Sequence, residues 1–255
     1  MYVISKFLVR LLSSLCNFNR LASYSTLKLS FSGSFSPRKL EENQLISRQP
    51  NNSRDMLYKG TTTVGIVCKD GVVLGTDTRV TMGHFVAHKQ GKKIYRIDDH
   101  LAVTIAGVVG DAQTVVEILK ANANLYRLNV GRPMPVKTAA RMTANLLYNS
   151  RAYPLILQAL VAGVDEQGGQ IIVLDPLGSL IEERCVSTGS GSPIAYGVLE
   201  DEYQEDIEVK EGIRLVVRAV SSAMKRDIAS GDNMDVASIT KDGFKMLNEE
   251  EKATI

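Results

Sequence analysis

Gly60 and Thr61 stand where two compositionally different stretches of the chain meet, and Thr61 is the residue there best able to do chemistry. A threonine at the start of a strand can simply reflect β propensity. A cut before Thr61, however, would leave one residue carrying both a hydroxyl and a free α-amine. Such an amine has an unperturbed pKa of about 7.7–8.0, so it can accept the hydroxyl proton near neutral pH without any histidine. Because Gly60 has no side chain, it would allow the strained turn that Thr61 needs in order to attack the Gly60 carbonyl.

Three other arrangements could do chemistry, and each is weaker. His84 and His88 are spaced like two metal ligands on a helix, but their segment reads as a strand and lacks the glutamate of HExxH. The glycines at 189–191 lack the third glycine of a dinucleotide loop and the GK[ST] of a P-loop. With three histidines and no GxSxG, a Ser-His-Asp triad is poorly supplied. We therefore expect no metal and no cofactor.

The overall charge of +2 is the sum of two unlike pieces. Residues 1–60 hold nine basic and three acidic side chains, whereas residues 61–255 hold 21 and 25. The second piece has the length of one domain with a sizeable core. Its negative balance gives no basic footprint for nucleic acid. The three cysteines, which are far apart and form no CxxC pair, favour reduced thiols and a cytoplasmic protein.

Residues 1–60 are predicted to be a leader that the working protein lacks. The first 40 residues contain no acid and many serines, and their longest apolar stretch is too short to cross a membrane. Three explanations remain open: a reading frame that truly starts at Met56, a long propeptide, or a targeting segment. Residues 33–55 have the composition of an unstructured linker.

The elements that would position Thr61 follow from the pattern of residues 61–255. Strands are predicted at 61–69, 72–77, 101–106, 155–163, 170–175, 235–239 and 243–247, and 84–88 is expected to pair with 92–97. Helices are predicted from an N-cap at Asp111, at 136–148 and at 211–227, with 186–192 as a loop. Runs of strands and runs of helices indicate an α+β fold with two antiparallel sheets faced by helices.

Six segments closely resemble the beta subunits of archaeal proteasomes, from Thr61 to about Leu247. They are GTTTVGIV at 60–67, GTDTRVTMG at 75–83, HKQGKKIY at 88–95, TIAGVVGDAQ at 104–113, STGSGSPIAYGVLE at 187–200 and KRDIASGDNMDVA at 225–237. The resemblance implies the N-terminal nucleophile hydrolase fold, a four-layer αββα sandwich of two antiparallel sheets between helices. It also implies a threonine endopeptidase that is cut autocatalytically at Gly60–Thr61.

The same resemblance implies a role for each matching residue. Thr61 would be the nucleophile and its amine the base, Lys93 would favour the deprotonated hydroxyl, and Asp77 would hold Lys93 in place. The backbone N–H of Gly107 would face the developing oxyanion. The remaining catalytic residues would surround the amine: Ser190, Asp227 and Ser230.

A pocket for the residue before the scissile bond is implied as well. Its mostly apolar walls predict cleavage after hydrophobic or aromatic residues. The lining residues would be Val80, Gly91, Tyr95, Ile105, Val109 and Gln113.

The implied partners are alpha subunits and other beta subunits in stacked seven-membered rings, unfolded protein substrates and a separate ATPase regulator, without membrane or nucleic acid. Two alternatives stay open. The chain could be a structural beta subunit that keeps its leader and does no catalysis. It could also be a simpler bacterial peptidase with rings of six, which the long GSGSPIAYGVLE match makes less favoured.

Overall fold

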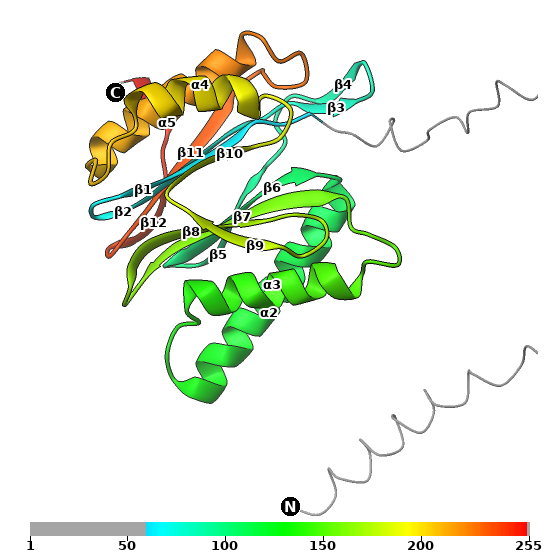
Figure 1. The fold of residues 1–255 in the computed structure, drawn as a ribbon, viewed down its shortest axis with the longest axis vertical. Helices are drawn as coiled ribbons and strands as arrows, with labels where there is room; N and C mark the ends of the chain where they lie inside the picture. Colours follow the sequence, from blue (N-terminus) through cyan, green and yellow to red (C-terminus); the bar gives the residue numbers. More distant parts are fainter. Residues whose placement is uncertain (1–59, 254–255) are drawn as a thin grey trace, which may run out of the picture. The chain divides into compact units, whose positions relative to one another are not determined.

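Two β-sheets lie face to face between pairs of helices in residues 60–253, the part of the chain that the structure, a computed structural model, describes (Figure 1). The expectations for the leader, including a start at Met56, fall on residues outside this range. The first sheet has the order β10-β1-β2-β11-β12. Its strands are β1 (Thr63–Cys68), β2 (Gly71–Asp77), β10 (Cys185–Thr188), β11 (Met234–Thr240) and β12 (Gly243–Met246).

The second sheet has the order β5-β6-β7-β8-β9, and every neighbouring pair in both sheets is antiparallel. Its strands are β5 (Ile94–Asp98), β6 (Leu101–Gly107), β7 (Leu157–Asp165), β8 (Gly168–Leu174) and β9 (Leu180–Glu183). A separate hairpin joins β3 (Val80–Met82) to β4 (Phe85–His88).

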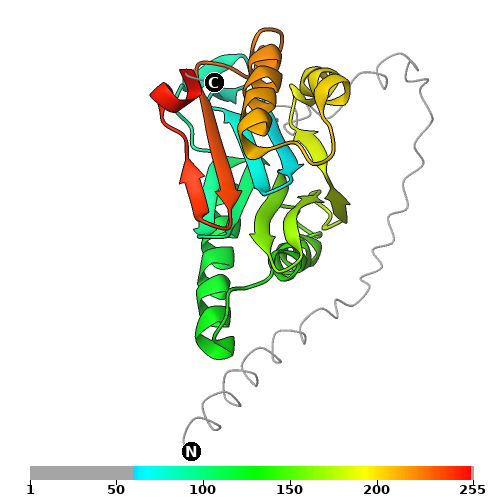
Figure 2. The ribbon, with the colours of Figure 1, turned by 90° about the vertical axis from the view of Figure 1, so that its left-hand side faces the viewer.

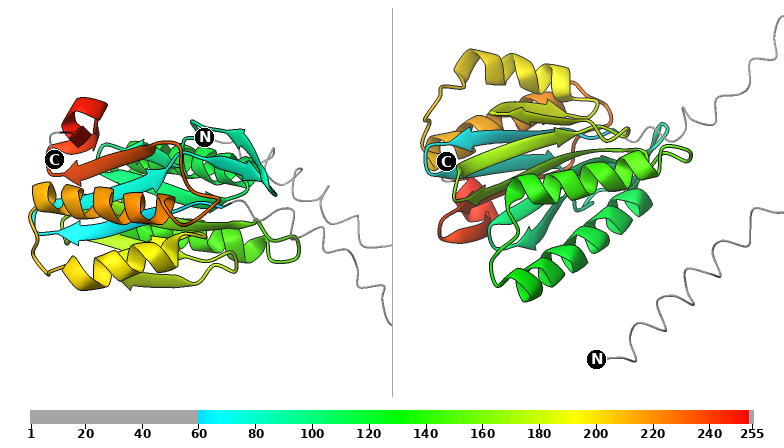
Figure 3. Two further views of the ribbon diagram at one scale, coloured as in Figure 1. Left: turned by 90° about the horizontal axis from the view of Figure 1, so that it is seen from above. Right: turned by 60° about the horizontal axis from the view of Figure 1, so that its bottom comes forward.

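Helices cover the outer face of each sheet. Figure 3 shows α2 (Val109–Val130) and α3 (Val136–Asn149) on one outer face and α4 (Ser192–Glu202) on the other. Beside α4, α5 (Val209–Met224) lies across the strands of the first sheet, as Figure 2 shows. A short α6 (Glu249–Ala253) follows the last strand. Within residues 60–253 no helix is long and apolar enough to cross a membrane.

Three apolar layers hold these elements together. The alternation of side chains along a strand sends Ile66 and Val73 toward α4 and α5, whereas Val72 and Leu74 face the second sheet. A third cluster lies between the second sheet and helices α2 and α3. Because both faces of β1 and β2 are buried, these strands read as continuous apolar runs. The predicted four-layer αββα sandwich is confirmed.

Some local predictions were wrong. Segments 84–88 and 92–97 do not pair with each other, because β4 folds back on β3 and β5 joins β6. Asp111 is not an N-cap, since α2 begins at Val109 and the Asp111 carboxylate accepts the backbone N–H of Ile156. Part of the expected loop at 186–192 is the edge strand β10.

Strand pairing brings distant loops to one end of the first sheet. Thr63 lies opposite both Thr76 of β2 and Thr188 of β10, so residue 61 lies near Asp77 and near the loop after β10. The pairing of Met234 with Asp77 adds the loop that precedes β11. The candidate site is therefore built where several strands end.

Candidate active site

Thr61 is buried, with 3% of its surface exposed, and its hydroxyl lies against the peptide bond that precedes it. The Thr61 Oγ1 donates a hydrogen bond to the Gly60 carbonyl oxygen at 2.7 Å. The Thr61 backbone N–H donates to Ser190 Oγ at 3.2 Å. Gly60 is fixed from the other side, because its N–H donates to Thr81 Oγ1 at 3.2 Å. The hydroxyl is thus held next to the carbonyl that it would attack.

Asp77 and Lys93 form a buried ion pair beside this threonine. The Lys93 ammonium donates to Asp77 Oδ1 at 2.6 Å, and the side chains are 7% and 0% exposed. Asp77 also accepts three backbone N–H groups, from Thr62, Arg79 and Gly231. Four donors around one carboxylate fix its position.

Burial dominates the electrostatics of Lys93. Loss of water around its ammonium lowers the pKa of Lys93 from its ordinary value, and the nearby carboxylates of Asp77, Asp227 and Asp235 offset that effect in part. A lysine with a lowered pKa gives up its proton more easily than an exposed one. Lys93 lines the same pocket as Thr61.

Ser190, Asp227 and Ser230 form a second hydrogen-bonded group. Both serine hydroxyls donate to Asp227 Oδ2 at 2.6 Å. Ser230 also lies 2.7 Å from Thr62 Oγ1, and because Ser230 donates to the carboxylate, the Thr62 hydroxyl donates to Ser230. Ser190 reaches the Thr61 nitrogen, so Asp227 is linked through one serine to the atom that a cut would turn into an amine.

Gly107 ends β6 with a backbone that requires glycine. Its φ is +146°, and an added Cβ would lie 2.2 Å from the Ile156 carbonyl oxygen. Gly107 lines the same pocket as Thr61. The structure therefore brings all seven residues expected in the catalytic group to this end of the first sheet.

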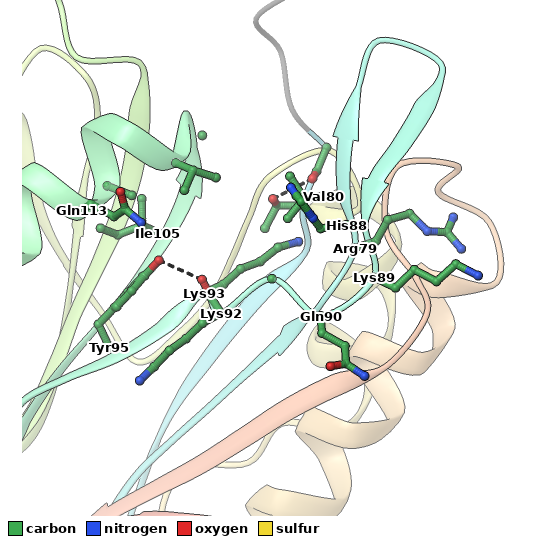
Figure 4. A pocket seen from close by; sticks show the side chains of 16 residues that line it. Arg79, Val80, His88, Lys89, Gln90, Lys92, Lys93, Tyr95, Ile105 and Gln113 are labelled. Carbon is green, nitrogen blue, oxygen red and sulfur yellow. Dashed lines mark hydrogen bonds between the residues drawn. The ribbon is translucent and has the colours of Figure 1, made fainter.

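A cavity of about 640 Å³ opens beside Thr61, and we call it the Tyr95 pocket. It is lined by all six residues that the sequence predicted for it: Val80, Gly91, Tyr95, Ile105, Val109 and Gln113. Figure 4 shows Tyr95, Ile105 and Gln113 on one side of the pocket and Val80 on the other. Gly91 is needed for close approach, because a Cβ there would lie 2.3 Å from Val80 Cγ2.

The walls of the Tyr95 pocket are less apolar than the sequence indicated. Arg79, His88, Lys89 and Lys92 also line it. The last three are exposed, whereas Val80 and Ile105 are buried. Tyr95 is held by its hydroxyl, which donates to the Lys92 carbonyl at 2.8 Å (Figure 4). The pocket therefore has an apolar interior and a basic, water-exposed rim.

Comparison with known proteins matches the proteasome subunit family over residues 57–239. The chain belongs to the proteasome subunit family. A protein of Methanothermobacter thermautotrophicus named proteasome subunit beta is 53% identical over 194 residues, which cover 76% of this chain and 92% of that relative. A proteasome subunit beta of Methanococcoides burtonii is 54% identical over 197 residues, which cover 77% of this chain and 94% of that relative. A proteasome subunit beta of Archaeoglobus fulgidus is 52% identical over 198 residues, which cover 77% of this chain and 93% of that relative. The resemblance to archaeal proteasome beta subunits is confirmed.

Arg79 is one residue near the site of this proteasome subunit that the sequence pattern did not indicate. Its guanidinium donates to Asp232 Oδ2 through Nε at 2.9 Å and to the Ile228 carbonyl through Nη1 at 2.9 Å. The hydrogen bond from Arg79 to Asp232 holds the pKa of the Asp232 carboxyl below its usual value. Arg79 thus binds both ends of the segment 228–232, which contains Ser230. The only signal in the sequence was that Arg79 lies two residues after Asp77. Its partners, Asp232 and Ile228, lie about 150 residues further along the chain.

No group of three or more His, Cys, Asp or Glu side chains in the described residues is arranged to hold a metal ion. His88 ends β4, a strand, and His84 directly precedes it. The groups that surround the Thr61 hydroxyl are the Gly60 carbonyl, Ser190 beside the Thr61 nitrogen, and the buried ion pair of Lys93 and Asp77.

Proposed function

We propose that this chain is a catalytic beta subunit of the proteasome core particle, a threonine endopeptidase that cuts unfolded proteins into peptides. Residues 1–60 would be removed by self-cleavage at Gly60–Thr61, and residues 61–255 would form the working hydrolase. The observation that carries the proposal is the 2.7 Å hydrogen bond from Thr61 Oγ1 to the Gly60 carbonyl. This contact supports the proposal, because the Thr61 hydroxyl would attack the one bond whose cleavage creates its own base.

Cleavage changes what the Thr61 nitrogen can do. In the intact chain it is an amide, which has no lone pair available to accept a proton. Once Gly60 leaves, it becomes an α-amine next to the Thr61 hydroxyl and can act as general base near neutral pH. Asp227 and Ser190 then lie where they can orient the amine and adjust its protonation. The uncut precursor would be inactive toward other proteins.

The peptidase reaction follows from this arrangement. The Thr61 hydroxyl gives its proton to the amine and attacks the substrate carbonyl, and the oxyanion is stabilised by the Gly107 N–H and by the charge of Lys93. Preorganised donors of this kind are worth about 3–4 kcal/mol of transition-state stabilisation. The amine then protonates the leaving nitrogen, and an ester forms on Thr61. Water releases the ester with the amine again acting as base, so the reaction needs no cofactor.

Assembly belongs to the same proposal. A proteasome subunit works with other subunits, and we place this chain with other beta subunits in the inner of stacked seven-membered rings, with alpha subunits outside. A separate ATPase would supply unfolded substrate, because the sequence has no P-loop. We place the particle in the cytoplasm.

A peptide panel tests the proposed activity. Peptides with leucine or tyrosine before the scissile bond should be hydrolysed by the assembled particle at least about tenfold faster than peptides with glutamate there. The buried Val80 and Ile105 favour an apolar side chain, whereas charges at the exposed rim are screened by salt. A preference for glutamate would overturn the assigned pocket, and an absence of hydrolysis would overturn the proposed function.

Gly60→Ala should slow self-cleavage strongly. An added Cβ would lie 1.7 Å from Ala229 Cβ and 3.0 Å from Ser190 Oγ, so the scissile carbonyl must move away from Thr61. A shift of about 1 Å can slow a reaction about a hundredfold. The second change Ala229→Gly removes the closest contact and should restore part of the rate, while Ala229→Gly alone should cleave normally. Intact mass, recorded over time, measures the fraction of chain that has been cut in each variant. Self-cleavage of Gly60→Ala at the wild-type rate would contradict this geometry.

Arg79→Ala should lower kcat about ten- to a hundredfold, because the segment holding Ser230 would lose its anchor. Arg79→Lys should recover part of the loss, since an ammonium can still pair with Asp232. Arg214→Ala is a matched control: Arg214 lies on α5 and pairs with Glu211 at an exposed site. Steady-state kinetics should separate the variants, and equal kcat for Arg79→Ala and Arg214→Ala would show that the anchor is dispensable.

A further inference from the structure

A row of threonine side chains crosses the first sheet close to the candidate site. Thr63 of β1 lies opposite Thr188 of β10 on one side and opposite Thr76 of β2 on the other, and Thr76 in turn lies opposite Asp235 of β11. The Thr63 and Thr188 hydroxyls are hydrogen-bonded at 2.6 Å, and none of the three threonines is more than 7% exposed. The row therefore ends at one half-buried carboxylate, that of Asp235.

This row faces the second sheet. Leu74 of β2 and Ala237 of β11 belong to the apolar cluster between the two sheets, and residues two apart on a strand share a face. Thr76 and Asp235 therefore point into the space between the sheets. Ile94, the first residue of β5, belongs to the same cluster. The start of β5 and the start of β11 thus border one interior region.

The Thr76 hydroxyl supports a charged Asp235. Thr76 is fully buried, and its Oγ1 has no hydrogen-bond partner among residues 60–253. Leaving a buried hydroxyl unpaired is costly. Side chains directly opposite each other on antiparallel strands have Cβ atoms about 5 Å apart, so a rotation of either side chain brings the Asp235 carboxylate within reach. Thr76 can then donate to that carboxylate.

The last helix of the described chain holds Asp235 in place. Lys252 of α6 donates to the Met234 carbonyl at 2.7 Å, and its side chain is only 9% exposed. Asn233 donates through Nδ2 to Glu249, at the start of α6, at 3.2 Å. The two residues that precede Asp235 are therefore both tied to the same helix, and the strand that follows runs between β2 and β12.

Asp235 and Lys93 act on each other's charge. Burial raises the pKa of Asp235, and Glu249 adds to that effect. Three cations act against it: Lys252, Lys92 and Lys93. The pKa of Lys93 is lowered by burial, and three carboxylates act against that effect: Asp77, Asp227 and Asp235. The charged groups around this pair thus come from β2, from β11 and the loop before it, from α6, and from the residues before β5.

We propose that Asp235 is a positioning residue of the peptidase site, a second carboxylate that keeps the Lys93 ammonium charged beside Asp77 and Thr61. This inference rests on the proposed threonine endopeptidase activity, in which a positive Lys93 stabilises the oxyanion. Asp235 does not line the Tyr95 pocket, so it acts on the reaction through Lys93. Without the charge of Asp235, Lys93 would lose its proton at a lower pH, and peptide hydrolysis would decline earlier as the pH rises.

The test compares the pH profiles of kcat/KM of assembled wild-type and Asp235→Asn particles with one fluorogenic peptide. The rate should fall at acidic pH as the Thr61 amine becomes protonated, and at alkaline pH as Lys93 loses its proton. In Asp235→Asn the alkaline fall should move to lower pH by about half a pH unit or more, because a nearby opposite charge has been removed. A residue with only a structural role would lower the rate at every pH alike.

Three further variants make the result specific. Asp235→Glu keeps the charge and should keep the alkaline half of the profile where it is in wild type. Asp235→Ser is a second neutral replacement with a smaller side chain, and it should show the same move as Asp235→Asn even if the latter fails to assemble. Asp242→Asn is the matched control at the exposed turn between β11 and β12, and it should change neither half of the profile.

The outcomes separate the role of Asp235 from the activity itself. An alkaline half that stays in place in the neutral variants, or that moves to higher pH, would overturn the role of Asp235 and leave the peptidase activity standing. An equal move in Asp235→Glu would also overturn it, because the charge would then not be the cause. Failure of the wild-type particle to hydrolyse the peptide would instead overturn the proposed function, and the role of Asp235 with it.

Discussion

Thr61→Ala should leave the chain uncut and reduce peptide hydrolysis on the order of a thousandfold or more, since nucleophile and base would be lost together. The variant keeps the backbone and the Cβ, so the buried site should still pack and assembly should be unchanged. The amide N–H can still donate to Ser190, which isolates the hydroxyl as the missing part. Intact mass and a fluorogenic peptide assay on the same particles measure both effects.

Two companion variants make this result specific. Thr61→Ser keeps a hydroxyl and should retain self-cleavage and activity, whereas Thr62→Ala removes a neighbouring hydroxyl that contacts Ser230 rather than Gly60. Thr62→Ala should therefore still be cut at Gly60–Thr61. Cleavage of Thr61→Ala at the normal position would show that another protein processes the leader.

Lys93→Met should have the second large effect, because it removes a charge from a buried pair while nearly preserving volume. The Asp77 carboxylate, which is 0% exposed, would lose the ammonium at 2.6 Å. Breaking a buried pair in this way costs about 3–5 kcal/mol, and the three remaining N–H donors place the expected value near 3. Activity should fall at least about a hundredfold, since Thr61 loses the nearby positive charge.

Urea unfolding and peptidase assays check the Lys93→Met prediction against Lys69→Met, a change at an exposed turn. The Lys69 variant should differ from wild type by no more than about 0.5 kcal/mol. If Lys93→Met kept full activity, the ion pair would be structural only. If it kept full stability, the pair would contribute nothing to the fold.

The burial of Lys93 should also affect how the free energy of unfolding depends on pH. Burial lowers the pKa of Lys93 in the folded chain below the ordinary value of 10.5. Between those two values the unfolded chain binds the proton more often, so the contribution of Lys93 to the free energy of unfolding increases as the pH rises through that window. Lys93→Met should lack this increase. The difference between the two unfolding curves isolates it from other titrating groups.

Much of the fold could be predicted from local pattern. The strands predicted at 61–69 and 72–77 are β1 and β2, and the helix predicted at 211–227 is α5, which buries Ile213, Val216 and Val220 at helical spacing. The pairing of β4 could not be read this way. Two short strands near a Gln-Gly pair suggest a hairpin, but tertiary contacts gave each strand another partner.

The site could be predicted only in part, for a physical reason. The residues around Thr61 matched known segments and lie together, yet the reach of Arg79 to Asp232 spans 153 residues and leaves no local pattern. The rim of the Tyr95 pocket was missed likewise. Nothing in the local sequence pattern places Lys89 and Lys92 in one pocket with Val80, because the fold brings them together.

Residues 1–60 carry a net charge of +6, and the proposed cut at Gly60–Thr61 would remove them. The most direct measurement is the intact mass, with N-terminal sequencing, of the chain recovered from assembled and active particles. We predict a chain that begins at Thr61. A chain in active particles that still carries residues 56–60 would contradict the proposed mechanism, because the Thr61 nitrogen would then be an amide and could not serve as the base.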